Sequence, residues 1–106
     1  MTNPRLDAMR AMVARNPTNA LARFGLANEA AKEGLLDEAL EHLQVYLASY
    51  DDEGNGWARA ADLYERLGRL DDARDALRKG IEAANRFGHP GMMSELEAKL
   101  EELDSA

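Results

Sequence analysis

The sequence predicts an all-α protein, an array of antiparallel helix pairs with about six helices, and three observations support this prediction. The segment Gly34–Leu43 returns as Gly68–Leu77, a step of 34 residues. A fixed period of this size is typical of helical repeat proteins. Apolar residues recur at helical spacing along the chain, and glycine or proline separates the helical stretches.

The composition is that of a globular protein, since 45% of the 106 residues are hydrophobic and 31% are charged. We expect one domain over residues 1–106 with a modest core. No apolar run approaches the roughly 20 residues of a membrane-spanning helix, and the N-terminal segment lacks the apolar core of a secretory signal. We therefore expect a cytoplasmic protein without a membrane partner.

Cysteine content and net charge argue against further classes of site. The absence of cysteine rules out disulfides, thiolate zinc sites and a cysteine nucleophile. The net charge of −7 argues against a nucleic acid partner, because sequence-independent binding to phosphates needs a surplus of Lys and Arg. The motifs of phosphate-binding loops, metal ligation and nucleophile elbows are also missing, so we expect no enzyme and no cofactor.

The first predicted helix spans residues 3–16 and forms half of a repeat, because it aligns with the second helix of a pair. Asn3 is suited to cap it, and Pro4 takes the first helical position, where its missing N–H costs nothing. Pro17 follows its end. Its apolar stripe consists of Leu6, Met9, Met12 and Val13.

The first complete helix pair spans residues 18–51. Thr18 or Asn19 can cap its first helix. Gly34 ends that helix by supplying the left-handed conformation that other residues adopt only at a cost. Two acidic residues begin the second helix, where the helix dipole favours negative charge. The apolar members of the pair are Leu21, Phe24, Leu26, Ala27, Ala30, Ala31, Leu36, Ala39, Leu40, Leu43, Tyr46, Leu47 and Tyr50.

The second complete pair spans residues 52–88, with Gly68 at its turn, and a last helix follows over residues 90–104. The inward residues of the second pair are Trp57, Ala60, Ala61, Tyr64, Leu67, Leu70, Ala73, Leu77, Gly80, Ile81 and Ala84. The last helix is apolar on one side and charged on the other, which suits the open end of a solenoid. With two extra residues allowed in the preceding turn, the repeat alignment places Met93, Leu96 and Leu100 inward.

The second pair carries most of the signature of a known repeat, in Trp57, Ala61, Tyr64, Gly68, Ala73 and Leu77. In these residues the sequence resembles tetratricopeptide repeat proteins, and its full length resembles the small stand-alone members found in bacteria. The resemblance implies a right-handed solenoid with a half repeat, two full repeats and a capping helix. Three residues depart from the family pattern. Arg23 stands where the pattern has a bulky apolar residue, and Tyr46 and its counterpart Gly80 stand where it has alanine.

The resemblance also implies a function, that of an adaptor which binds a peptide or helix of a partner protein. The binding surface in such arrays is the concave face lined by the first helix of each pair. Residues matching that face here are Leu21, Phe24, Asn28, Lys32, Asn55, Arg59, Asp62 and Arg66, with Ala58 and Glu65 beside them. The capping helix would add Ser94, Ala98 and Glu101. The sequence does not identify the partner protein or peptide.

Alternatives are open for several of these residues. Phe24 either faces the groove or turns into the core, since its neighbour Arg23 cannot fill an apolar slot. Arg59, Asp62 and Arg66 either bind a ligand or form a solvated ion ladder along one helix face. In a second functional hypothesis, apolar patches that include Phe24, Tyr50 and the pair Met92 and Met93 drive self-association. For the oligomeric state we expect a monomer or a weak homodimer.

Two sharper alternatives are not favoured. The clamp with which some tetratricopeptide domains hold a chaperone's C-terminal carboxylate is matched at Asn28, but Phe24 and Arg59 replace its lysine and second asparagine. A calcium-loop spacing is matched imperfectly by Asp51, Glu53, Asn55, Gly56 and Asp62. The repeat alignment already explains this segment as a turn, so we expect no metal site.

Overall fold

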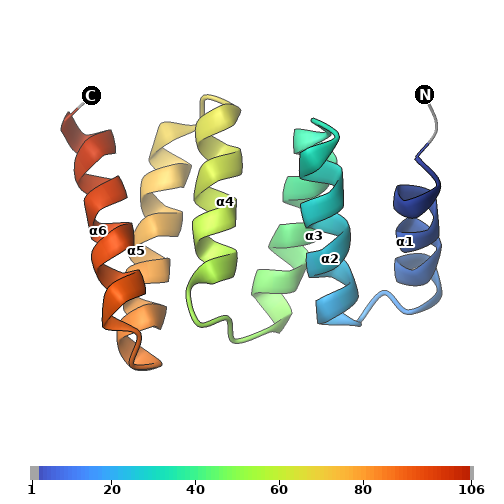
Figure 1. Cartoon of the computed structure of the whole chain (residues 1–106), viewed down its shortest axis with the longest axis horizontal. Coiled ribbons are helices and arrows are strands. Elements are labelled where there is room, and N and C mark those ends of the chain that lie inside the picture. The colour runs from blue at the N-terminus through green and yellow to red at the C-terminus, as the bar shows by residue number, and fades with distance from the viewer. Residues whose placement is uncertain (1–2, 106) are drawn as a thin grey trace. The chain divides into compact units, whose positions relative to one another are not determined.

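The computed structural model describes residues 3–105, and within them the chain is built from six α-helices without a β-strand (Figure 1). The helices are α1 (Pro4–Arg15), α2 (Ala20–Lys32), α3 (Leu36–Ser49), α4 (Asn55–Arg66), α5 (Leu70–Arg86) and α6 (Pro90–Ser105). The predicted all-α class and the number of helices are confirmed. None of the described helices is long and apolar enough to cross a membrane.

The single predicted domain divides into two compact units. The N-terminal unit is residues 1–50 and contains α1, α2 and α3. The C-terminal unit is residues 51–106 and contains α4, α5 and α6. Within each unit, helices that follow one another in the chain pack side by side.

Side-chain caps begin three of the six helices. The side chain of Asn3 accepts a hydrogen bond from the backbone N–H of Leu6, and that of Asn19 accepts one from Ala22. Both caps were predicted, with Thr18 as the alternative to Asn19. The third cap was not predicted: the buried carboxylate of Asp52 accepts the N–H groups of two glycines at the start of α4, at 2.8 and 2.7 Å.

Tight turns with glycine in the left-handed region join α2 to α3, α4 to α5 and α5 to α6. Gly34, Gly68 and Gly88 have φ of 77°, 77° and 73°. In each turn the N–H after the glycine bonds back to a carbonyl five residues earlier, as from Leu35 to Ala30 at 2.9 Å. Such a bond satisfies a carbonyl that the helix end leaves unpaired, and it requires a left-handed residue.

In the N-terminal unit the core lies between the three helices, and small residues let α2 and α3 approach closely. The buried hydrophobic residues of the unit are Leu6, Val13, Leu26, Ala27, Ala30, Ala39, Leu40, Leu43 and Tyr46. Tyr46 is only 3% exposed, although it stands where the family usually has alanine. Its ring packs on Phe24 and stacks on the exposed Tyr50, with centroids 4.7 and 5.2 Å apart.

In the C-terminal unit the core relies on close backbone approach. Its buried hydrophobic residues are Ala60, Ala61, Leu63, Ala73, Ala76, Leu77, Ala83, Ala84, Leu96 and Leu103. A Cβ atom added at Gly80 would lie 3.0 Å from Cβ of Trp57 and 3.0 Å from Cδ1 of Leu96, so a side chain there would require these neighbours to move by a few tenths of an ångström. Leu70 was predicted to face inward but is exposed, because it begins α5 next to the exposed turn at Gly68.

Candidate functional site

The clearest candidate site in the C-terminal unit is a hollow of about 170 Å³ between α4 and α6, which we call the α4–α6 groove. Residues from three helices line it: Ala58, Ala61, Asp62 and Glu65 from α4, Leu77 from α5, and Lys99, Glu102 and Leu103 from α6. Ala61, Leu77 and Leu103 are buried and form an apolar floor. The groove therefore combines an apolar floor with charged walls.

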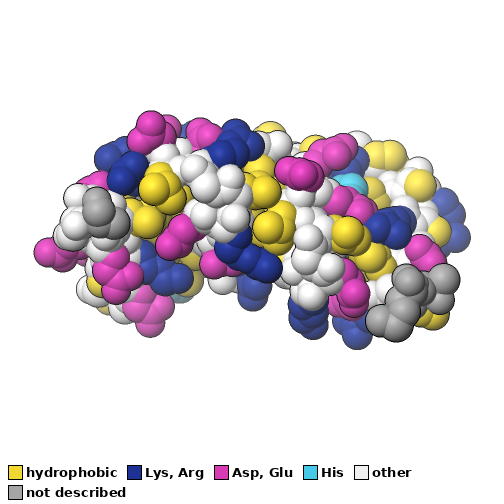
Figure 2. Space-filling view, turned by 90° about the horizontal axis from the view of Figure 1, so that it is seen from above, with side chains coloured by type: hydrophobic (Ala, Val, Ile, Leu, Met, Phe, Trp, Pro, Cys, Tyr) yellow, Lys and Arg dark blue, Asp and Glu magenta, His cyan; other side chains and the backbone are white. Residues whose placement is uncertain are grey.

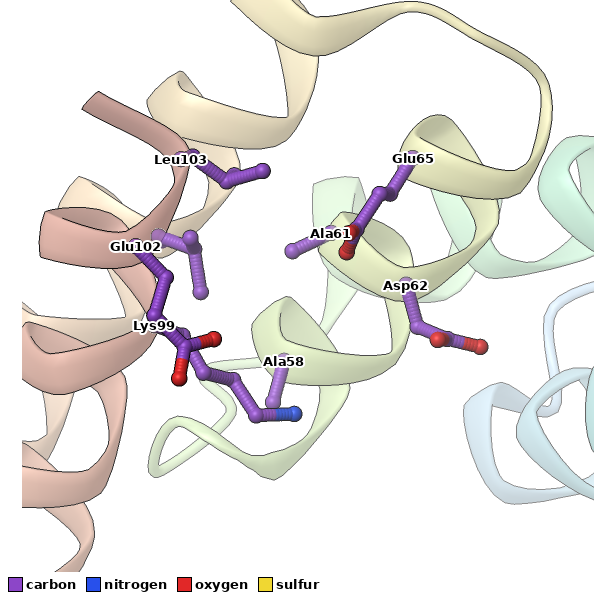
Figure 3. Close-up of a pocket in the computed structure, with 8 residues that line it drawn as sticks. Ala58, Ala61, Asp62, Glu65, Lys99, Glu102 and Leu103 are labelled. Carbon is purple, nitrogen blue, oxygen red and sulfur yellow. The ribbon is translucent and has the colours of Figure 1, made fainter. Parts of the chain in front are cut away.

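The charged side chains of the groove point in different directions (Figure 3). Glu65 projects from α4 into the hollow beside Ala61, whereas Asp62 points away from α6. Lys99 extends from α6 toward Ala58. The carboxylate of Glu65 and the ammonium group of Lys99 therefore lie at different parts of the groove.

The acidic side chains of the two walls are largely unpaired. Asp62 lies 3.8 Å from Arg66 on the next turn of α4, an exposed contact that stabilises little. Within the part of the chain that the structure describes, neither Glu65 nor Glu102 has a cation at ion-pairing distance. Both carboxylates are thus available to a positively charged ligand.

The predicted site residues of the C-terminal unit are only partly gathered in the groove. Asp62 lines it, as do Ala58 and Glu65, which lie on the predicted face of α4. Asn55 begins α4 and is half-buried, and Arg59 and Arg66 are exposed on the same helix outside the groove lining. The predicted ion ladder is present as the pair Asp62–Arg66.

The contribution of α6 differs from the predicted one. Ala98 and Glu101 line a second, more open hollow with Glu102 and Ser105. Ser94 is exposed and lines neither this hollow nor the α4–α6 groove. The groove wall is instead made by Lys99, Glu102 and Leu103. The reason is the rotation of α6, whose buried residues are Leu96 and Leu103, while Met93 and Leu100 are only partly buried.

Lys99 and Glu102 could have been found from the sequence. Leu96 and Leu103 are seven residues apart, which is close to two helical turns. If that pair is taken as the buried edge of α6, residues three and six positions after Leu96 lie beside it. Those residues are Lys99 and Glu102.

The predicted site residues of the N-terminal unit lie along α2. Leu21 is 66% exposed and Lys32 is exposed, with its ammonium group 3.8 Å from Glu29. Asn28 and Phe24 are half-buried. Since one part of the Phe24 ring packs on the buried Tyr46 and another part stays accessible, the structure lies between the two alternatives for this side chain.

Comparisons with known proteins agree with this arrangement. A family model described as tetratricopeptide repeat matches residues 1–84. The chain belongs to the tetratricopeptide repeat family. It is 30% identical over 101 residues to the TPR repeat-containing protein PA0015 of Pseudomonas aeruginosa, an alignment covering 95% of this chain and 96% of that protein. The solution structure of protein BPP2914 from Bordetella parapertussis is similar, with a TM-score of 0.79, 28% identity, and coverage of 99% of this chain and 90% of that one.

One departure from the tetratricopeptide pattern, Arg23, is accommodated by a polar network in the N-terminal unit. Its guanidinium group donates from Nε to the carbonyl oxygen of Pro17 at 3.2 Å and lies 3.0 Å from Nδ1 of His42. Because a guanidinium group can only donate, Nδ1 accepts, and the ring proton of the neutral imidazole is on Nε2. That atom faces Glu38 at 3.5 Å.

The same network ties α1 to α3. Arg10 donates to both carboxylate oxygens of Glu38, at 2.9 and 2.7 Å. These bonds stabilise the charged carboxylate and lower the pKa of Glu38 below its usual value, and His42 adds to the effect. The network thus replaces, with charged groups, the apolar contact that the tetratricopeptide pattern has at position 23.

The residues of the calcium-loop spacing have other roles in this tetratricopeptide chain. Asp51 pairs with Arg86 of α5, and Asp62 faces Arg66. Across residues 3–105 no group of three or more His, Asp or Glu side chains is placed to hold a metal ion. The segment before α4 is accounted for by the cap of Asp52.

Proposed function

We propose that this protein is an adaptor that binds a peptide or a helix of a partner protein, and that the α4–α6 groove is part of the binding surface. Tetratricopeptide repeats are generally protein–protein interaction modules. The observation that carries the proposal is the groove itself, in which Ala61, Leu77 and Leu103 form an apolar floor between charged walls. Burial of a partner's apolar side chain on this floor would supply affinity, and the charged rim would supply specificity.

The exposed face of α2 is the second proposed contact surface. Leu21 has 66% of its surface exposed, and Phe24 presents part of its ring on the same helix. Asn28 and Lys32 continue this face toward the end of α2. Aromatic side chains such as phenylalanine are enriched at protein–protein interfaces, so the accessible part of the Phe24 ring is the main proposed contact of this face. We propose no catalytic role, because the family is a non-catalytic repeat family.

A peptide-display selection tests the adaptor function. Random peptides would be selected on the immobilised protein, and the Kd of recovered peptides would be measured by titration calorimetry. We expect Ala58→Gln, which places a longer side chain in the groove, to weaken binding by about tenfold or more, equivalent to ~1.4 kcal/mol. Ser94→Gln, an exposed change on α6 outside the groove, is the matched control and should leave Kd unchanged.

The outcomes separate the adaptor from other functions. Recovery of no saturable binder would contradict it. Binders that are insensitive to Ala58→Gln but lost in Leu21→Asp would keep the adaptor function and move the site to α2.

Self-association is the second candidate function, and exposed apolar side chains favour it. Met12, Leu21 and Tyr50 are 50%, 66% and 44% exposed, all in the N-terminal unit. A sedimentation-velocity series over a wide concentration range tests this. A mass that rises with concentration and returns to that of the monomer in Leu21→Asp supports self-association, whereas a monomer throughout excludes it.

A further inference from the structure

The α4–α6 groove holds more negative than positive charge around an apolar floor. Asp62, Glu65 and Glu102 line it, against Lys99 as the one lining cation of the described groove. The two glutamates come from opposite walls, one from α4 and one from α6. Neither has an ion-pair partner within residues 3–105. Each wall therefore offers one carboxylate to a positively charged ligand, that of Glu65 beside Ala61 and that of Glu102 beside Lys99 (Figure 3).

The floor suits a particular kind of cation. Ala61, Leu77 and Leu103 are 4%, 2% and 8% exposed, so the bottom of the groove is hydrocarbon. Lysine and arginine side chains have an apolar stem and a charged head, and they bury the stem on apolar surface while the head stays at a polar rim. A metal ion or a small inorganic cation would gain nothing from such a floor.

Lys99 leaves room for such a side chain. It extends toward Ala58, whereas Glu65 points into the hollow beside Ala61 (Figure 3). The part of the groove near Glu65 and Leu103 is therefore not covered by the chain's own lysine.

The charge of the whole C-terminal unit acts in the same direction. Residues 51–106 contain fourteen Asp and Glu against eight Lys and Arg, whereas residues 1–50 contain six against five. The net negative charge of the chain thus belongs almost entirely to the unit that holds the groove. Figure 2 shows Asp and Glu side chains over this unit, interspersed with Lys and Arg. Such a field attracts basic partners and raises their association rate.

We infer that the α4–α6 groove takes a lysine or arginine side chain of the partner's peptide, with its stem on the floor and its head between Glu65 and Glu102. The inference rests on the proposed adaptor function and specifies the chemistry of its ligand. Charge-assisted hydrogen bonds to two carboxylates distinguish this side chain from an apolar one of similar length.

The test uses two synthetic pentapeptides, alanine peptides with a central arginine or a central citrulline and with blocked ends. Citrulline keeps the length and planar head of arginine without its charge. We expect the arginine peptide to shift the backbone amide resonances of Ala61, Glu65 and Leu103 saturably, and the citrulline peptide to bind about tenfold more weakly or not at all.

Variants with equal charge provide the control. The double variant Glu65→Gln with Glu102→Gln should bind the arginine peptide more weakly by about tenfold or more, since both proposed contacts are lost. Glu82→Gln with Glu97→Gln removes the same charge from exposed positions outside the groove and should have little effect. Lys99→Gln should strengthen binding. Equal loss in both double variants, or equal binding of citrulline, would overturn the inference, since the attraction would then be non-specific.

The peptide selection separates this inference from the function on which it rests. Groove-dependent peptides enriched in lysine or arginine support both proposals. Peptides that are lost in Ala58→Gln but show no such enrichment overturn the basic side chain and keep the adaptor. Failure to recover any binder contradicts the adaptor itself.

Discussion

The two units fill the same two repeat positions with different side chains. Arg23 and Trp57 are one repeat step of 34 residues apart, and so are Tyr46 and Gly80. In the N-terminal unit the second helix carries the bulk, in the buried ring of Tyr46. In the C-terminal unit the first helix carries it, because Trp57 lies against Gly80. The buried bulk at these positions therefore comes from the second helix in one unit and from the first helix in the other.

The comparison extends to a position that lines the α4–α6 groove. Phe24 and Ala58 are again one repeat step apart. Phe24 packs its ring on Tyr46, whereas Ala58 lines the α4–α6 groove with a single methyl group. One repeat position is therefore filled by an aromatic ring in one unit and left open in the other. A repeat protein can in this way present different surfaces from one framework.

The largest expected effect comes from Tyr46→Ala, which restores the usual residue of the family pattern. We expect a loss of stability of about 3 kcal/mol or more, because the ring is buried and its removal leaves a cavity under Phe24 and Tyr50. Urea denaturation would measure this loss of stability, and amide hydrogen exchange would show whether it is located in α2 and α3. Tyr50→Ala, at a site that is 44% exposed, is the control and should cost much less. Equal losses would mean that burial does not distinguish the two rings.

A smaller loss is expected from Gly80→Ala. The added Cβ would meet Trp57 and Leu96 at 3.0 Å, so these side chains must give way, and we expect a cost of about 1 to 3 kcal/mol. Gly25→Ala in α2 is the matched helical change, since there the new Cβ meets only the flexible end of Met9, at 3.2 Å. Alanine is the better helix former, so that variant should be neutral or slightly stabilised. Thermal denaturation of both variants checks the contrast, and a destabilised Gly25→Ala with a neutral Gly80→Ala would reverse it.

The polar network makes the N-terminal unit sensitive to acid. Arg10 lowers the pKa of Glu38 in the folded state, so the pair stabilises the fold above the usual pKa of a glutamate, and this stabilisation is lost as pH falls through the lowered value. We expect the stability of the protein to decline as the pH falls below about 4.3. The Glu38→Gln variant should be less stable at neutral pH, and its stability should depend less on pH. Melting temperatures from neutral to acidic pH would show it. Parallel curves for the two proteins would contradict the assignment to Glu38.

The smallest effect is expected for the ion pair on α4. Arg66→Ala removes an exposed partner 3.8 Å from Asp62, and exposed pairs of this kind contribute about 0.5 kcal/mol or less. Thermal melts at low and high salt would test this. A loss well above ~0.5 kcal/mol that persists at high salt would show that Arg66 has a structural role beyond the pair.

Local signals in the sequence determined the fold class and the helices. The 34-residue period, the Asn caps and the glycine turns predicted six helices close to their observed bounds, because helix formation and termination depend on hydrogen bonds and torsion angles within a few residues. The family followed from the same repeat signature. Ala58, Asp62 and Glu65, which the resemblance placed on one face of α4, line the α4–α6 groove together.

Only the tertiary structure decided which side chains meet. The rotation of α6 brings Lys99 and Glu102 to the groove, and it depends on how Leu96 and Leu103 pack. The leucine spacing on α6 offers a signal for Lys99 and Glu102, whereas the cap by Asp52 and the contact of Arg23 with His42 were not visible in any local pattern. These features arise from side chains brought together by folding, and their geometry depends on packing volume and hydrogen-bond reach, which periodicity does not encode.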